Sequence, residues 1–215
     1  GELATLIRQQ LPTASVTARA SAFVLVSSEE RSFGTQIVGV EPGHEPGVST
    51  IPGLLAEGRY LEDPAAAEIV IGSVMARNLK VNVGDELTFL GSGKDCSFAA
   101  GVVNVVGVFD SGSSELDRSL AEIPLAYFQD AFAMGASGHV IALAASDLRS
   151  VPVMLEHLRS MISSREGLVV LDWEALMPVL KQSIHTDFAS SLFMYAVLIL
   201  LVAFSVLNTQ LMSVL

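Results

Sequence analysis

Residues 192–207 read LFMYAVLILLVAFSVL, and this run decides how the chain is organised, because Ser205 is its only polar residue. Around it, residues 188–215 contain no Asp, Glu, Lys or Arg, and 21 of these 28 residues are apolar. A helix from Leu192 to Leu215 is about 36 Å long, which is enough to cross a hydrocarbon core of roughly 30 Å. The sequence therefore predicts one transmembrane helix over residues 188–215.

Three polar residues, Asn208, Thr209 and Gln210, follow one another near the far end of this helix. Such side chains are costly when they face lipid, whereas they form hydrogen bonds when they face other helices of a membrane bundle. The alternative is an interfacial position where water satisfies them. We expect Asn208 to face protein and Thr209 and Gln210 to lie nearer the membrane–water boundary, which makes all three candidate contacts within a bundle.

The segment before the apolar run predicts a helix that continues out of the membrane. Asp172 is a suitable N-cap for a helix beginning at Trp173, and no glycine separates Trp173 from the apolar run. Pro178 removes one backbone hydrogen bond and is expected to kink the helix early. A continuous helix from Trp173 to the end of the chain would be about 64 Å long, roughly twice a bilayer core. The sequence thus predicts a stalk over residues 173–187, with Trp173 and Pro178 as candidate residues of a coupling helix.

The first 187 residues carry all the charge of the chain, 12 basic and 23 acidic residues for a net charge of −11. An acidic body repels nucleic-acid phosphates and anionic lipid surfaces, so we expect no nucleic-acid partner. Cys96 is the only cysteine, so neither a disulfide within the chain nor a cysteine-based zinc site can form. It lies in a turn rich in Gly, Asp and Lys, and we expect its thiol to be at least partly accessible.

Hydrophobic alternation and turn residues predict a body in which strands alternate with short helices. The predicted strands are 16–27, 34–40, 68–71, 87–90, 102–109, 123–125, 139–145 and 168–171. The predicted helices before the stalk are 51–57, 73–79, 127–134 and 151–163. Because residues 139–171 read as strand, helix and strand, we predict an α+β fold. Its α/β layer would come from residues 1–60 and 137–172, with a mostly β subdomain, residues 61–136, inserted between the two halves.

No catalytic or cofactor motif stands out in the sequence. Gly93 and Lys94 come nearest to a phosphate-binding loop, but Thr88 stands where its first glycine belongs and Asp95 where its hydroxyl residue belongs. The histidines lack the spacing of a metal site, and the segment GASG at 135–138 is one residue short of a nucleophile elbow. We therefore expect no catalytic residue, no cofactor and no metal site.

Six short segments occur in a fixed order along the chain. They are IVGVEP at 37–42, EIVIGSVMARNL at 68–79, VGDEL at 83–87, VVGVFDSG at 105–112 followed by ELD at 115–117, DWE at 172–174 with Pro178, and LNTQLMSV at 207–214. In these segments the chain resembles the extracytoplasmic domain and second transmembrane helix of ABC transporter permeases of the MacB/LolC/LolE type. The FDSG segment with Asp117 favours the lipoprotein-releasing LolC/LolE branch over the MacB branch.

The resemblance implies a permease subunit with four membrane helices in the inner membrane, of which this chain holds the second, and residues 1–187 would be extracytoplasmic. Its α/β porter part and inserted β-rich part would match the division at 61–136. The partners implied are a cytoplasmic ABC ATPase, which would carry out ATP hydrolysis, a second permease subunit in a homo- or heterodimer, and a periplasmic carrier or adaptor protein. Substrates in the family include lipoproteins, drugs, peptides and toxins. The stalk would transmit ATP-driven movement.

Two other functional classes stay open on the sequence. A ligand-sensing domain, tethered by a membrane helix to a cytoplasmic signalling output, would have the same acidic body and stalk. The residues after 215 would distinguish the two, because two further apolar spans indicate a permease and a long cytoplasmic coiled coil indicates a sensor. A membrane-anchored hydrolase ranks third, because the sequence has no nucleophile motif.

Overall fold

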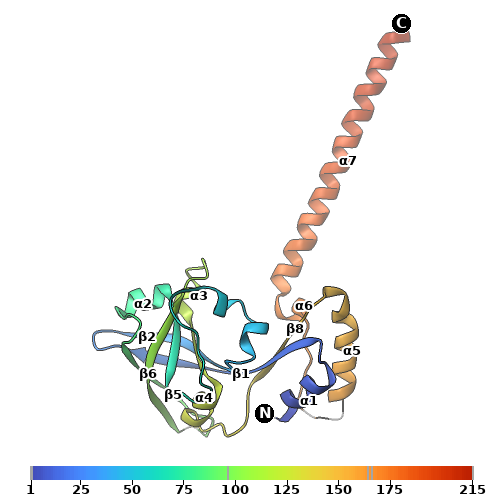
Figure 1. Ribbon diagram of the computed structural model, residues 1–215. Helices are drawn as coiled ribbons and strands as arrows, with labels where there is room; N and C mark the ends of the chain where they lie inside the picture. Colours follow the sequence, from blue (N-terminus) through green and yellow to red (C-terminus); the bar gives the residue numbers. More distant parts are fainter. Residues whose placement is uncertain (1, 96, 164, 166, 215) are drawn as a thin grey trace. The chain divides into compact units, whose positions relative to one another are not determined.

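The computed structural model describes residues 2–95, 97–163, 165 and 167–214, and it divides into two compact units, residues 1–150 and residues 151–215. In chain order, the first unit contains α1 (Glu2–Gln10), β1 (Ala14–Ser27), β2 (Ser32–Val40), the 3-10 turns η1 (Glu45–Gly47) and η2 (Ile51–Gly53), β3 (Leu55–Gly58), β4 (Glu68–Gly72), α2 (Ser73–Leu79), β5 (Glu86–Ser92), β6 (Phe98–Phe109), α3 (Leu116–Ser119), β7 (Leu120–Pro124), α4 (Leu125–Ala131), β8 (Val140–Ala145) and η3 (Leu148–Ser150). The second unit contains α5 (Val151–Ile162), α6 (Trp173–Leu176) and α7 (Pro178–Val214) (Figure 1).

The predicted α+β fold followed by a long apolar helix is confirmed, and two of its predicted elements are wrong. Residues 51–57 were expected to be helical, but η2 ends after one turn at Gly53 and β3 follows as a strand paired with β6. Residues 168–171 were expected to be a strand, but they join no strand in the described part of the chain. Leu168, Val169 and Leu171 are instead exposed, so this apolar run is not a buried strand.

The strands of the first unit form one sheet that closes on itself. Its order is β2-β7-β4-β6-β5-β1-β8, and β1 also pairs with β2, so that six of the described strands make a ring to which β8 and β3 are added. Strand β1 makes the closure possible because its 14 residues are enough to pair with three neighbouring strands. Residues 14–19 pair with β8, residues 19–27 pair with β2, and residues 25–27 pair with β5.

Strands β4 to β7, which lie in the predicted inserted subdomain, are hydrogen-bonded into this same ring with β1 and β2. Two pairs in the sheet are parallel. Strands β2 and β7 are far apart in the chain, and β4 and β6 are separated by α2 and β5. The division of the body at residues 61–136 stays a prediction.

Phe128 of α4 and Phe132, which follows that helix, complete the main core of the ring. The strands contribute Val24, Val26, Ile37, Ile69, Ile71, Phe89, Val103, Val105 and Ile123, all of them buried. The ring of Phe132 stacks on the rings of Phe128 and Phe89, with centroid distances of 4.3 Å and 5.6 Å. Gly39 of β2 leaves room for the side chain of Phe128, since a Cβ at position 39 would lie 2.7 Å from the Cβ of Phe128.

A second, smaller core lies on the opposite face of the sheet. Val70 stands between Ile69 and Ile71 in β4 but belongs to this second cluster, because successive strand residues point to opposite faces. It packs with Val40 and Phe109 of the sheet and with residues of the segment that connects β2 to β4, Ile51 and Leu61. This connecting segment therefore covers one outer face of the ring.

The second unit shows where the predicted stalk helix is interrupted. Asp172 caps α6 as predicted, because its side chain accepts a 2.9 Å hydrogen bond from the backbone N–H of Ala175. The helix does not continue from Trp173, because Met177 leaves the helical region at φ −128° and ψ 64°. Pro178 therefore does not kink a helix; it is the first residue of α7, where a missing N–H breaks no helical hydrogen bond.

Helix α7 runs for 37 residues, from Pro178 to Val214. Its stretch Lys181–Gln210 is long and apolar enough to cross a membrane, judged by length and composition. In the structure none of the apolar window in this stretch is buried, which leaves the apolar side chains without protein partners among the described residues.

Candidate functional site

The residues predicted for coupling and membrane contacts lie at the two ends of the α6–α7 segment. Trp173 is the first residue of α6 and is about half exposed, and Pro178 is the first residue of α7. Asn208, Thr209 and Gln210 lie about 45 Å further along α7. The structure therefore does not bring the two groups together. The hydroxyl of Thr209 donates a 2.9 Å hydrogen bond to the carbonyl of Ser205 within the same helix, and the roles of these residues stay predictions.

The loop that came nearest to a phosphate cradle is a connection between β5 and β6. The backbone N–H of Gly93 donates to the carbonyl of Ser97 at 2.9 Å, and that of Lys94 donates to the carbonyl of Phe132 at 3.0 Å. These donors are already used, so they are not available to phosphate oxygens. Cys96 lies outside the described residues. Among the residues that are described, no group of three His, Cys, Asp or Glu side chains is placed to hold a metal ion.

Two glutamates fasten the loop after β2 to strand β1. Glu41 accepts a 3.0 Å hydrogen bond from the backbone N–H of Ala18 and pairs with the guanidinium of Arg8. Glu45 is fully buried and accepts hydrogen bonds from the hydroxyl of Thr17, at 3.0 Å, and from the guanidinium of Arg19. The sequence predicts only a Pro- and Gly-rich loop here, and nothing in it signals that Glu45 would be buried.

A third carboxylate, Glu122 of β7, is buried on the face of the sheet that carries the second core. Its register neighbours on the adjoining strands are Val38 of β2 and Val70 of β4, so its surroundings are largely apolar. Its one hydrogen-bond donor among the described residues is the hydroxyl of Tyr60, at 2.7 Å. A lone acid inside the apolar run LAEIPL was the signal that could have revealed it.

Burial raises the pKa of Glu122 to about 7; the hydrogen bond from Tyr60 opposes the rise, the charge of Glu45 adds to it, and the charge of Arg19 opposes it. Burial also raises the pKa of Tyr60 well above its usual range. Because the folded state holds the proton of Glu122 more tightly than the unfolded state, this group favours folding most below about pH 4.5. That contribution is lost as the pH rises from about 4.5 to about 7.

We expect Glu122→Gln to remove this loss, because glutamine can accept the hydrogen bond of Tyr60 at every pH. The free energy of unfolding is measured by urea denaturation at pH 5 and at pH 8. Between these two pH values it should fall by up to about 3 kcal/mol more in the parent chain than in the variant. Glu115→Gln, at an exposed position of the same unit, is the control and should keep the parent's pH dependence. Equal slopes for the parent and Glu122→Gln would show that Glu122 does not titrate in this range.

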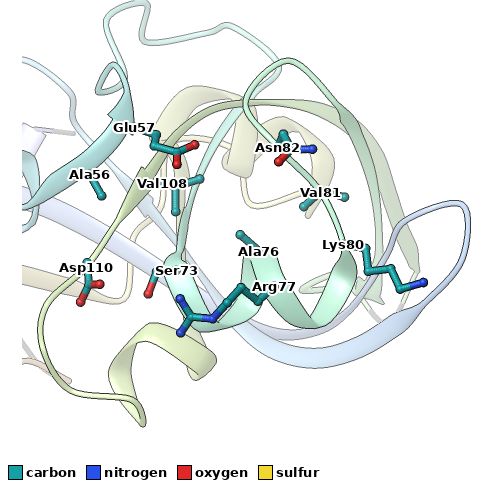
Figure 2. Close-up of a pocket in the computed structure, with 10 residues that line it drawn as sticks. All are labelled: Ala56, Glu57, Ser73, Ala76, Arg77, Lys80, Val81, Asn82, Val108 and Asp110. Carbon is teal, nitrogen blue, oxygen red and sulfur yellow. The ribbon is translucent and has the colours of Figure 1, made fainter.

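A cavity of about 540 Å³ in the first unit lies between β3, α2 and the end of β6 (Figure 2). Its apolar lining consists of Ala56, Ala76, Val81 and Val108. Its polar lining consists of Glu57, Ser73, Arg77, Lys80, Asn82 and Asp110. The cavity thus combines small apolar side chains with acidic, basic and neutral polar groups.

Local hydrogen bonds place the polar residues around this cavity. Asp117 is buried and accepts hydrogen bonds from the backbone N–H and the hydroxyl of Ser111, at 2.9 Å and 2.6 Å, which orders the loop that carries Asp110. Asn82 donates its backbone N–H to the carboxylate of Asp85 at 2.8 Å. Lys80 ends α2 in the left-handed conformation, with φ at 56°. Two of the segments that carry the family resemblance, 68–79 and 105–112, therefore contribute residues to this cavity.

Comparison with known proteins assigns the fold. Residues 1–160 match the sequence model of a family described as the MacB-like periplasmic core domain. The periplasmic region of MacB from Actinobacillus actinomycetemcomitans superimposes with a TM-score of 0.57 at 18% identity, covering 85% of this chain and 80% of that one. The extracellular domain of YknZ, a noncanonic ABC-type transporter from Gram-positive bacteria, gives a TM-score of 0.60 at 16% identity, covering 80% of this chain and 88% of that one.

No curated relative matches the sequence. At these low identities the structural matches establish the fold alone, and the family model supplies the membership. Because that model spans well over half of the chain, the chain belongs to the family of MacB-like periplasmic core domains.

Proposed function

We propose that the chain is part of an ABC transporter permease subunit, namely its extracytoplasmic domain and the membrane helix that follows. The observation that carries the proposal is α7, whose 37 residues run without interruption from Pro178 through a stretch that is apolar enough to cross a membrane. The family supports it, because the matched domain is described as periplasmic. The fold supports it as well, because YknZ is described as a transporter of the ABC type.

In this proposal α6 and α7 couple a cytoplasmic ATPase to the extracytoplasmic domain. A rigid helix conveys rotation and translation, whereas a flexible linker conveys neither, because its ends move independently. The joint at Met177 is held by the Asp172 cap and by an ion pair between Glu174 of α6 and Lys181 of α7. ATP hydrolysis would take place on the separate ATPase, since the backbone donors of the Gly93–Lys94 loop are already used.

The finer assignments follow from the sequence resemblance. A second permease subunit would pack against α7, with Asn208 facing it, and a periplasmic carrier or adaptor protein would be a further partner. We propose a lipoprotein as the exported or extracted substrate, supported by the FDSG segment and Asp117. In the structure Asp117 orders that segment through its two hydrogen bonds from Ser111.

The location of the body tests the proposal. In a chain with Cys96→Ser, a single cysteine at the exposed position Ser114 should react with a membrane-impermeant thiol reagent once the outer membrane is permeabilised. Reaction is expected before the inner membrane is lysed, because residues 1–187 lie outside the cytoplasm in this proposal. Reaction only after lysis of the inner membrane would place the body in the cytoplasm and refute the proposal. The parent with Cys96→Ser and no added cysteine gives the background.

A further inference from the structure

The cavity beside α2 contains a buried hydroxyl without a hydrogen-bond partner. Ser73 is 8% exposed, and its Oγ atom makes no hydrogen bond with any described residue. Buried polar groups in folded proteins are nearly always paired, and leaving one unpaired costs free energy. Ser73 lines the cavity. A ligand that accepts a hydrogen bond there would supply the missing partner.

Two uncompensated charges of opposite sign line the same cavity. Arg77 of α2 and Glu57 of β3 are exposed and form no ion pair or side-chain hydrogen bond with the described residues. Lys80, by contrast, is paired with Glu30 at 2.6 Å. Figure 2 shows Arg77 and Ser73 on the helical side of the cavity and Glu57 and Asp110 on the strand side. One Asp110 oxygen accepts a 3.0 Å hydrogen bond from the backbone N–H of Gly112, and the other is not used by a described residue.

The size and the apolar lining of the cavity restrict what it can hold. A volume of about 540 Å³ falls within the range of small-molecule sites, which are typically lined by apolar side chains and a few convergent polar groups. Ala76, Val81 and Val108 are buried and provide a shallow apolar floor that suits small side chains. The pairing of β3 with β6 shifts register between Leu55 and Glu57, and such irregularities often re-aim a side chain beside a site.

We propose that this cavity binds a small zwitterion, a free amino acid or short peptide with an unblocked amino group and an unblocked carboxylate. The carboxylate accepts charge-assisted hydrogen bonds from Arg77 and a hydrogen bond from Ser73. The ammonium group donates to Glu57 and Asp110. Small side chains, such as those of alanine, rest on the apolar floor. This site goes beyond the proposed transport role and is testable without any transport assay.

Isothermal titration of the full chain in detergent with trialanine tests the proposal. We expect saturable binding of trialanine, and affinities at least about tenfold weaker for N-acetyl-trialanine and for trialanine amide, because each loses one charge-assisted contact. Arg77→Gln should weaken trialanine binding, and this variant should bind trialanine and trialanine amide equally. Glu57→Gln should weaken trialanine binding and reduce the preference for trialanine over the acetylated form, because Asp110 is then the only carboxylate of the described lining left to accept from the ammonium group. Arg149→Gln, an exposed arginine that does not line the cavity, should bind like the parent.

Ser73→Ala separates a ligand contact from a structural role. We expect weaker trialanine binding together with a thermal stability no lower than that of the parent, because the lost hydroxyl has no partner among the described residues. Three results would overturn the proposal: no binding of trialanine at millimolar concentration, equal binding of the doubly blocked N-acetyl-trialanine amide, or unchanged binding by Arg77→Gln, Glu57→Gln or Ser73→Ala. Because these readouts need no ATPase, they fail or succeed independently of the proposed transport function.

Discussion

Replacing Glu45 by alanine should lower the free energy of unfolding by about 2–3 kcal/mol, less than for a fully buried ion pair, because the side chain of Arg19 is 31% exposed. The carboxylate is fully buried, and its loss leaves the Thr17 hydroxyl and the Arg19 guanidinium without their acceptor. For a domain of this size the melting temperature should fall by on the order of 10 °C. Thermal unfolding followed by circular dichroism measures the change.

Glu30→Ala is the matched control, because its ion pair with Lys80 lies at the surface, with both side chains more than half exposed. Exposed pairs contribute about 0–1 kcal/mol, so this variant should melt close to the parent. The double variant Glu45→Ala, Arg19→Met should recover part of the lost free energy of unfolding, because it also removes the positive charge that Glu45→Ala leaves unpaired at Arg19. If Glu45→Ala melts no lower than Glu30→Ala, Glu45 does not hold the loop to β1.

The strands and short helices of the body were predictable from local patterns. In β1 and β4 apolar residues alternate or run together between turn signals, and both strands appear where that pattern predicts them. Helix α2 follows β4 directly and ends at Leu79, which also matches the prediction. These successes depend on neighbouring residues only, which is the information that periodicity contains.

The closure of the sheet was not predictable in the same way. It depends on β1 using residues 25–27 for β5 and residues 14–19 for β8, a long-range choice with no local signal. Pro178 was predicted to kink a continuous helix, yet the residue before a proline is disfavoured in helical geometry. Met177 accordingly leaves the helical region, so the proline starts a new helix.

The candidate sites were the least predictable part. The cavity draws its polar groups from Glu57, from residues 73–82 and from Asp110, and no local pattern in the sequence indicates that these parts of the chain meet. Glu45 was hidden in a loop that composition marks as solvated. Its burial results from a contact with β1, some 26 residues away along the chain. Burial of a polar residue is a property of the whole fold, so local patterns do not reveal it.

Inserting one alanine between Asp187 and Phe188 should uncouple transport from ATP hydrolysis more severely than inserting four. The insertion point lies inside α7, so added residues extend the helix. One residue rotates everything before it by about 100° relative to the membrane, whereas four residues rotate it by only about 40° while adding about 6 Å. If α7 transmits movement as a rigid rod, the orientation matters more than the length. Transport and ATP hydrolysis, measured together in the assembled transporter, give the degree of coupling.

The position of the joint determines how strong this effect can be. A rod that begins at Pro178 would still push and pull across Met177, and the ion pair between Glu174 and Lys181 is one contact that would resist rotation of α6 against α7. Lys181→Ala should therefore weaken coupling in the same direction as a single insertion, though less, and leave the body folded. A flexible Gly-Ser insertion after Asp187 is the decisive control: if it leaves transport at the parent rate, α7 serves only as a tether, and mechanical coupling through the stalk is excluded.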